Sequence, residues 1–239
     1  MSLLDSLRVL GAMARISVPS LLEMRRGELT RDAIDDRARW FGRRVIELLD
    51  IRLDAWGAEI LPPGRPYVYM SNHQSHLDIP VLYATLPSLS IRMLAKKELF
   101  RIPFWGDGLR AAEFIEVDRS NHERAVQSIE RAAALLRDGV SIYLAPEGTR
   151  SRDGRIGRLK KGGFHLALAT GVPIVPVAVR GTIDILPRGS RSMRTGCPVR
   201  VRIGTPIRVQ GRDIEGLMEE VRSFLVKNVE GPKPVEMIH

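Results

Sequence analysis

The chain has 239 residues, of which 44% are hydrophobic, and it carries a formal net charge of +9 at pH 7. This length and apolar content exclude a disordered polypeptide and allow one large domain, or a domain with a small appendage. The single cysteine, Cys197, excludes an internal disulfide and is compatible with a reducing compartment.

The first 55 residues are predicted to form two helices. Apolar residues recur at steps of three and four between residues 3 and 18 and again between residues 34 and 49, and Thr30 is placed to cap the second helix. Packing against the rest of the chain would account for both helices. The alternative is a helix pair that lies on a membrane surface, with apolar residues in the acyl boundary and arginines at the headgroups. A membrane-spanning helix is excluded, because the charges at Asp5, Arg8 and Arg15 leave no apolar run of the ~20 residues that it needs.

Strands and helices alternate after the Pro-Pro-Gly at residues 62–64. This alternation predicts an α/β fold with a mixed, largely parallel sheet flanked by helices, whose strand ends supply the functional site. We therefore divide the chain into an N-terminal helical pair, residues 1–55, which we assign as a membrane-surface anchor, and a domain of residues 56–239. The predicted strands are 67–70, 91–95, 114–117, 141–144, 174–179 and 199–203, and the predicted helices are 79–86, 122–137, 164–170 and 214–226.

The longest uncharged stretch, GGFHLALATGVPIVPVAV at residues 162–179, is long enough to be mistaken for a membrane span. Thr170-Gly171 is a turn signal, and Pro173 and Pro176 would break a helix. The stretch is therefore predicted to be a helix, a turn and a buried strand.

A polar cluster follows the strand at residues 67–70, in the sequence YVYMSNHQSHLDIP. On a regular helix His73 and Asp78 would lie roughly 140° apart and could not pair. If His73 lies in a turn and Asp78 begins the next helix, the carboxylate can accept a hydrogen bond from one imidazole nitrogen. The other nitrogen is then free to act as a general base.

Three other interpretations of this cluster compete with a general base. Ser71 or Ser75 could complete a Ser-His-Asp triad, although neither lies in a G-x-S-x-G turn. His73, His76 and Asp78 could bind a metal, although no further histidine or cysteine clusters with them. A turn whose polar side chains merely cap a helix would explain the cluster if it stood alone.

A second polar segment, APEGTRS at residues 145–151, follows the strand at residues 141–144. It offers a carboxylate at Glu147, a hydroxyl at Thr149 and a guanidinium at Arg150, and Arg119 follows another strand. Two guanidiniums near a His-Asp pair can hold a phosphate through paired N–H donors while the base acts beside it.

Positive charge is concentrated in the region that begins at Arg150. Residues 150–208 contain thirteen Arg and Lys but only two acidic residues, Asp153 and Asp184. A solvated basic surface would account for such a run, and the alternatives are contacts with anionic lipid, a phosphorylated ligand or nucleic acid.

The order of motifs resembles that of the glycerolipid acyltransferases, especially the bacterial 1-acylglycerol-3-phosphate acyltransferases, over residues 65–210. The first family motif, asparagine-histidine, four variable residues and aspartate, corresponds to NHQSHLD at residues 72–78. The second corresponds to FIEVDR at 114–119, the third to PEGTR at 146–150 and the fourth to VPIVPV at 172–177.

The resemblance implies an O-acyltransferase domain over residues 56–239. It would move a fatty acyl group from acyl-CoA or acyl-carrier protein to the free hydroxyl of a lysophospholipid, with 1-acylglycerol 3-phosphate as the expected acceptor and phosphatidic acid as the product. No metal or prosthetic group is expected, and no nucleic acid partner. The protein is expected to lie at the cytoplasmic face of the inner or plasma membrane, as a peripheral or monotopic protein.

The resemblance also implies a role for each site residue. His73 would deprotonate the acceptor hydroxyl, and Asp78 would hold the histidine tautomer and stabilise the imidazolium. Arg119 and Arg150 would bind the acceptor phosphate, with Glu147 ordering them or accepting a hydroxyl, and backbone N–H groups near Gly148 would stabilise the oxyanion. The substrate-binding set is completed by Asn72, Thr149 and two lysines expected at the donor's phosphates, Lys160 and Lys161.

Other functions remain compatible with these residues. The acceptor could be glycerol 3-phosphate, a lyso-ornithine lipid or a glycolipid, and the same base could activate water in a thioesterase. A non-catalytic basic protein that binds membranes or nucleic acid would use the positive half of the chain. The His73-Asp78 pair argues against that last function, because phosphate affinity alone needs no base.

Overall fold

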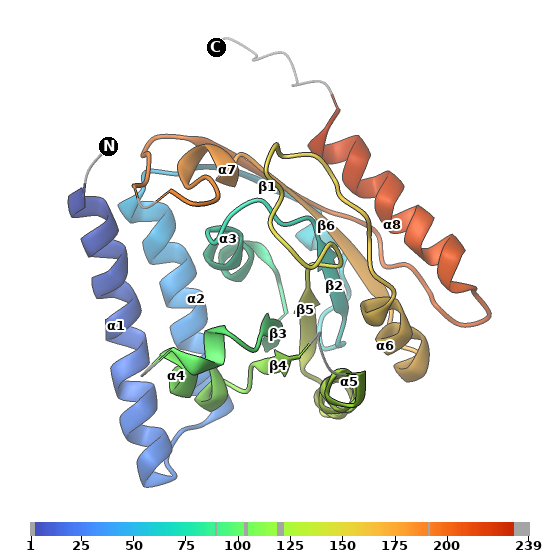
Figure 1. The fold of residues 1–239 in the computed structure, drawn as a ribbon, viewed down its shortest axis with the longest axis horizontal. Coiled ribbons are helices and arrows are strands. Elements are labelled where there is room, and N and C mark those ends of the chain that lie inside the picture. Colours follow the sequence, from blue (N-terminus) through green and yellow to red (C-terminus); the bar gives the residue numbers. More distant parts are fainter. Residues whose placement is uncertain (1–2, 89, 103–104, 119–121, 191, 232–239) are drawn as a thin grey trace.

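The computed structural model describes residues 3–88, 90–102, 105–118, 122–190 and 192–231, and these residues form a seven-stranded sheet with helices on both faces (Figure 1). The strand order is β1-β7-β6-β2-β5-β3-β4. The five strands from β6 to β4 are mutually parallel, β7 is antiparallel to β6, and β1 is parallel to β7. The predicted mixed, largely parallel sheet is therefore confirmed. The strands are β1 (Arg52–Trp56), β2 (Val68–Ser71), β3 (Ile91–Lys96), β4 (Ile115–Val117), β5 (Ser141–Leu144), β6 (Ile174–Arg180) and β7 (Pro198–Ile203).

Helices cover the two faces of the sheet in two groups (Figure 1). One face packs against α1 (Leu3–Arg26), α2 (Arg31–Leu48) and α3 (Asp78–Thr85), and the other packs against α5 (His122–Arg137), α6 (Gly162–Thr170) and α8 (Ile214–Val229). The remaining helices are short: α4 (Trp105–Ala111), α7 (Thr182–Ile185) and two 3-10 turns, Ala58–Ile60 and Leu99–Arg101.

Strand β2 shows why its sequence is apolar throughout. Val68 and Met70 face the core beneath α5, α6 and α8, whereas Tyr69 faces the core beneath α1, α2 and α3. Alternate residues of a strand point to opposite faces, so a strand covered on both faces is buried at every position. All four residues of β2 are buried, and the strand is thereby fixed rigidly in front of the polar cluster that follows it.

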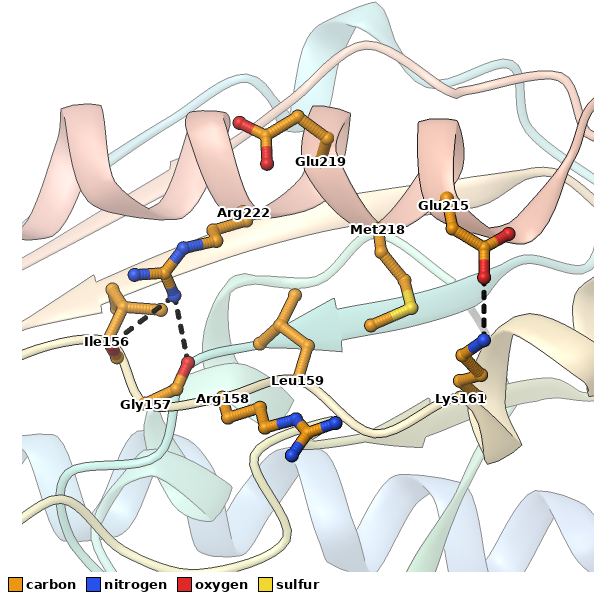
Figure 2. A pocket seen from close by; sticks show the side chains of 9 residues that line it. All are labelled: Ile156, Gly157, Arg158, Leu159, Lys161, Glu215, Met218, Glu219 and Arg222. Atoms are coloured by element: carbon orange, nitrogen blue, oxygen red, sulfur yellow. Dashed lines mark hydrogen bonds and ion pairs between the residues drawn. The ribbon is translucent and has the colours of Figure 1, made fainter.

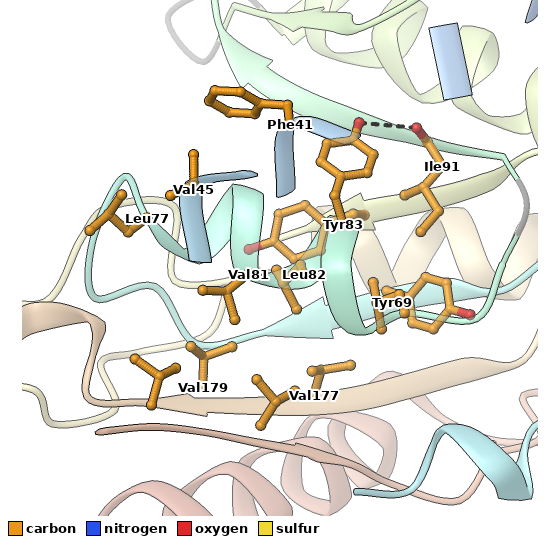
Figure 3. Packing of buried hydrophobic residues seen from close by; sticks show 14 of the residues in the cluster. Phe41, Val45, Tyr69, Leu77, Val81, Leu82, Tyr83, Ile91, Val177 and Val179 are labelled. Carbon is orange, nitrogen blue, oxygen red and sulfur yellow. Dashed lines mark hydrogen bonds between the residues drawn. The ribbon is translucent and has the colours of Figure 1, made fainter. Parts of the chain in front are cut away.

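Helix α2 packs into the same core as the sheet (Figure 3). Its residues Phe41 and Val45 join Val81 and Leu82 of α3 in one cluster of buried side chains. The helices approach so closely at Gly42 that an added Cβ would lie 2.6 Å from the carbonyl oxygen of Pro80. The domain boundary predicted after residue 55 falls inside β1, which pairs with β7.

A buried ion pair also attaches α2 to the sheet. Arg92 of β3 is fully buried, and its guanidinium donates to Asp35 of α2 and to Glu113. Glu113 in turn accepts two hydrogen bonds from Arg31 at 2.9 Å. A buried charge is strongly destabilising when its partner is removed, so this network makes α2 an integral part of the fold.

Several elements differ from the predicted ones. Helix α1 continues through Pro19 to Arg26, although a proline inside a helix commonly kinks or ends it. Strand β1 was not predicted, because it is an exposed edge strand in which Arg52 and Asp54 interrupt any continuous apolar run. The uncharged stretch 162–179 divides into α6, a turn at Gly171 and β6, as predicted. None of the helices in the described ranges is both long and apolar enough to cross a membrane.

Candidate active site

The polar segments singled out in the sequence meet at the carboxyl ends of adjacent inner strands of the sheet. Strands β6, β2 and β5 are adjacent and parallel, so their carboxyl ends lie side by side. The segment after β2 carries His73, the segment after β5 carries Glu147 and Arg150, and the segment after β6 carries Thr182. Sites in such sheets form beyond the carboxyl ends of the strands, and this is where the structure gathers these side chains.

His73 and Asp78 form the predicted pair. The Nδ1 nitrogen of His73 lies 2.7 Å from the Oδ2 oxygen of Asp78, which is completely buried at the start of α3. A carboxylate only accepts hydrogen bonds, so Nδ1 carries the hydrogen and donates the hydrogen bond. In the neutral ring the free lone pair is then on Nε2. About a fifth of the His73 side chain is exposed, so a substrate hydroxyl can reach the ring.

Asp78 is held by more than the histidine. Its Oδ2 oxygen also accepts the backbone N–H groups of Gln74 at 2.8 Å and Ser75 at 3.0 Å, and its Oδ1 oxygen accepts the Thr182 hydroxyl at 2.5 Å. These bonds satisfy a buried charge and fix its orientation. Thr182 was not predicted from the sequence, and its only signal is a Gly-Thr at the end of a buried strand.

Glu147 connects the two polar segments. Its Oε1 oxygen accepts the backbone N–H of His73 at 3.0 Å, and its Oε2 oxygen accepts that of Gly157 at 2.7 Å. Burial raises the pKa of Glu147 above its ordinary value, although the hydrogen bonds from Gly157 and His73 oppose that shift. Through these two bonds the side chain positions His73, and the substrate contact expected from the sequence stays a prediction.

The bonds of Glu147 lead to a prediction for Glu147→Gln. A carboxamide can accept only one of the two backbone N–H groups, and its NH₂ would face the other. An unsatisfied buried donor costs about 1–3 kcal/mol, so we expect a lower unfolding temperature and at least a tenfold lower kcat. Thermal melting and steady-state kinetics measure both. Gln74→Ala, which removes weaker bonds of 3.2 and 3.3 Å from the same loop, is the control, and equal kinetics for Glu147→Gln and the parent would contradict the positioning role.

Two other predicted substrate contacts have internal partners. The Asn72 side chain donates to the Val179 carbonyl at 2.7 Å and accepts the Val179 N–H at 2.8 Å, which extends the pairing of β2 with β6. Gly148 has a φ of +73°, which explains the glycine, and its N–H donates to the Ala145 carbonyl at 3.0 Å. This N–H therefore closes a turn, and the expectation that backbone N–H groups near Gly148 stabilise an oxyanion stays a prediction.

The serine and metal alternatives also lack support from the geometry. The Ser71 hydroxyl donates to the Asn72 carbonyl and contacts Tyr143, and the Ser75 hydroxyl donates to the Leu186 carbonyl. Neither hydroxyl is bonded to His73, as a triad requires. Across the described part of the chain, no three His, Cys, Asp or Glu side chains are grouped so that they could hold a metal ion.

The cationic candidates are placed unequally. Arg150 is half-buried, and the Ser151 N–H beside it donates to the His73 carbonyl at 2.7 Å, so this segment lies against the His73 loop. The Thr149 side chain is exposed. Arg119 lies outside the described residues.

A pocket of about 480 Å³ lies between residues 156–161 and α8 (Figure 2). Lys161 lines it and forms an ion pair with Glu215 at 2.6 Å, whereas exposed Lys160 does not line it. Gly157, which also lines the pocket, donates its backbone N–H to Glu147. The pocket therefore adjoins the His73 loop through that one carboxylate.

Comparison with known proteins identifies the family. Residues 52–180 match the family model described as Acyltransferase. The chain belongs to the acyltransferase family. The matched region of this family member runs from β1 through β6 and includes His73, Asp78 and the segment 145–151, so the resemblance inferred from the motifs is confirmed.

Individual relatives agree with this assignment. The chain is 37% identical over 179 residues to the chloroplastic 1-acyl-sn-glycerol-3-phosphate acyltransferase BAT2 of Brassica napus, covering 74% of this chain and 51% of that protein. It is 35% identical over 183 residues to the human 1-acyl-sn-glycerol-3-phosphate acyltransferase alpha, covering 75% and 64%. The match thus spans about half to two thirds of these relatives. The crystal structure of the 1-acyl-sn-glycerophosphate acyltransferase PlsC from Thermotoga maritima aligns over 95% of this chain and 94% of that one, with a TM-score of 0.81 and 29% identity.

Proposed function

We propose that this acyltransferase moves a fatty acyl group from acyl-CoA or acyl-carrier protein to the free hydroxyl of 1-acylglycerol 3-phosphate and so makes phosphatidic acid. The observation that carries the proposal is the His73-Asp78 pair, with a nitrogen-to-oxygen distance of 2.7 Å, at the sheet edge where Arg150 also lies. The names of the matched relatives supply the acceptor class.

The proposed reaction is a direct transfer with no covalent enzyme intermediate. Nε2 of His73 takes the proton of the acceptor hydroxyl as its oxygen attacks the thioester carbonyl carbon. The carbon–sulfur bond then breaks, and the imidazolium returns its proton to the leaving thiolate. Asp78 stabilises the imidazolium that forms between these steps, and its other hydrogen bonds keep the ring in place.

The test is acyl transfer by the purified protein from labelled palmitoyl-CoA, and separately from a palmitoyl-carrier protein, to a panel of acceptors. The panel contains 1-acylglycerol 3-phosphate, glycerol 3-phosphate, a lyso-ornithine lipid and a monoacylated glycolipid. We expect labelled phosphatidic acid as the main product. A main product from another acceptor would replace the proposed substrate, and release of free palmitate alone would identify a thioesterase.

We further propose that the protein works at a membrane surface, through α1. One side of this helix, including Val9 and Ala12, is buried in the core. Its other side exposes a row of large apolar side chains that the protein itself leaves in contact with water, and Arg8 and Arg15 lie beside that row. Such a helix can lie in the headgroup region with its apolar side in the acyl boundary. The exposed apolar residues are Leu4, Leu7, Leu10, Val18, Leu22 and Met24.

This proposal predicts the behaviour of a Leu7→Glu, Leu10→Glu double variant. Both side chains are more than half exposed, so the fold should be unaffected. Each buried leucine contributes about 1.5–3 kcal/mol to membrane binding, so vesicle affinity should fall by at least about 100-fold. Co-sedimentation with anionic vesicles and circular dichroism measure both quantities. Val126→Glu, at an exposed apolar residue of α5, is the control, and parental sedimentation of the double variant would exclude α1 as the contact.

Location on the cytoplasmic face of the inner or plasma membrane, and the absence of a nucleic acid partner, remain proposals that follow from this acceptor chemistry. A point variant is the suitable probe of α1, because deleting residues 1–55 would also remove buried Val45 and Leu49 and most of β1.

A further inference from the structure

A second arginine, Arg188, contacts the segment at residues 145–151, which carries Arg150. Arg188 follows α7, on the segment that leads away from β6. Its Nη1 nitrogen donates to the backbone carbonyl of Arg150 at 3.2 Å. The next N–H along the chain, that of Ser151, donates to the His73 carbonyl at 2.7 Å. The same peptide group therefore accepts from Arg188 through its carbonyl and donates to His73 through its N–H.

The segment that carries Arg188 is fixed against the His73 loop at successive points. The Gly181 N–H donates to the Gln74 side chain at 3.3 Å, the Thr182 hydroxyl donates to Asp78 at 2.5 Å, and the Ser75 hydroxyl donates to the Leu186 carbonyl at 2.8 Å. These contacts follow one another along the segment up to two residues before Arg188. The backbone that leads to Arg188 is thus held against the His73 loop, in part by the bond between Thr182 and Asp78.

The arrangement brings two like charges together, Arg188 and Arg150, at a nitrogen-to-carbonyl-oxygen distance of 3.2 Å. In the described part of the chain, neither Arg150 nor Arg188 forms an ion pair. Burial lowers the pKa of Arg150 and the charge of Arg188 lowers it further, and desolvation and the charge of Arg150 likewise lower the pKa of His76; the charge of Asp78 opposes both shifts but does not reverse them. Adjacent cations repel one another unless an anion lies between them. A ligand can supply that anion.

We propose that Arg188 is a phosphate-binding residue that, together with Arg150, grips the phosphomonoester of the acceptor beside His73. Arg188 lies outside all four sequence motifs, and the sequence alone gave no reason to select it. A guanidinium offers five N–H donors in a planar fork that fits phosphate oxygens, and only one N–H of Arg188 is bonded to Arg150. This inference rests on the proposed function, since it names the residue that makes that function selective for a phosphorylated acceptor.

The test separates anion binding from turnover. Binding of soluble glycerol 3-phosphate is measured by calorimetry on the parent protein, Arg188→Ala, Arg188→Lys and the control Arg208→Ala, which removes the same charge from an exposed site distant in sequence. Losing a charge-assisted bond should raise the Kd about ten- to hundredfold for Arg188→Ala. Arg188→Lys should fall between Arg188→Ala and the parent, because an ammonium keeps the charge but lacks the planar fork of paired donors. Arg208→Ala should stay within twofold of the parent.

Kinetics then identify the source of the phosphate. With 1-oleoylglycerol 3-phosphate as acceptor, Arg188→Ala should raise KM by a similar factor while kcat stays within threefold of the parent. Equal Kd and KM for Arg188→Ala and the parent, or no binding of glycerol 3-phosphate by the parent, would overturn the inference. Inorganic phosphate that binds as tightly as glycerol 3-phosphate would overturn the headgroup assignment. A parent that binds glycerol 3-phosphate through Arg188 but transfers no acyl group would contradict the proposed function and leave the phosphate site standing.

Discussion

His73→Ala is expected to lower the rate of acyl transfer by about 10³- to 10⁴-fold while the protein stays folded. The ring is partly exposed and its described hydrogen bond is to Asp78, so little packing is lost with it. General base catalysis contributes up to about 10⁴-fold, and each tenfold corresponds to about 1.4 kcal/mol of the activation barrier. Initial rates at saturating acyl donor and lysolipid measure the effect, and circular dichroism confirms the fold.

The matched control for this experiment is Ser71→Ala. Ser71 lies two residues before His73, and its hydroxyl contacts Asn72 and Tyr143. If the base acts directly on the acceptor, Ser71→Ala should retain activity within about tenfold, which corresponds to the loss of roughly one hydrogen bond. Inactivation by Ser71→Ala with a folded protein would revive the triad, and near-parental turnover by His73→Ala would exclude the histidine as the base.

Asp78→Asn is expected to cost about 10²- to 10³-fold, less than the loss of His73. Its Oδ2 position faces three donors, the His73 ring and the N–H groups of Gln74 and Ser75. The asparagine must therefore turn its carbonyl oxygen toward them and its NH₂ toward Thr182, whose hydroxyl can accept. The imidazole keeps its orientation and tautomer, and what is lost is the negative charge that stabilises the imidazolium.

Comparison with Asp78→Ala separates charge from structure. Alanine leaves two buried backbone N–H groups without an acceptor, at about 1–3 kcal/mol each, so this variant should melt at a clearly lower temperature than Asp78→Asn. We expect kcat to fall for Asp78→Asn while KM for the lysolipid is unchanged. Full activity in folded Asp78→Asn would show that no imidazolium forms in the rate-limiting step.

The parts of the site that depend on local sequence could be predicted. His73 and Asp78 are close in the chain, and their pairing follows from a turn that leads into a helix. Where helices cover a strand on both faces, its predicted bounds agree with the observed ones to within one or two residues. The strand predicted at residues 67–70, for example, is observed as β2 (Val68–Ser71). Burial on both faces requires a continuous apolar run, which the sequence shows directly.

The parts that depend on distant backbone groups could not be predicted. Glu147 and Asn72 were expected to meet substrate, but their partners are backbone atoms of His73, Gly157 and Val179. A motif shows which side chain is needed and does not show whether it faces a ligand or a neighbouring loop. Arg188 and Thr182 reach the site only because the sheet order places the end of β6 beside that of β2.

The most direct test of the central claim is a single-turnover experiment with labelled palmitoyl donor and excess protein in vesicles that contain 1-acylglycerol 3-phosphate. Samples are quenched at successive times, and the label is measured in the donor, the protein and the lipid products. Direct transfer through His73 predicts that label passes from the thioester into phosphatidic acid with none on the protein at any time. Label bound covalently to the chain as phosphatidic acid forms, or label found only in free palmitate, would contradict it.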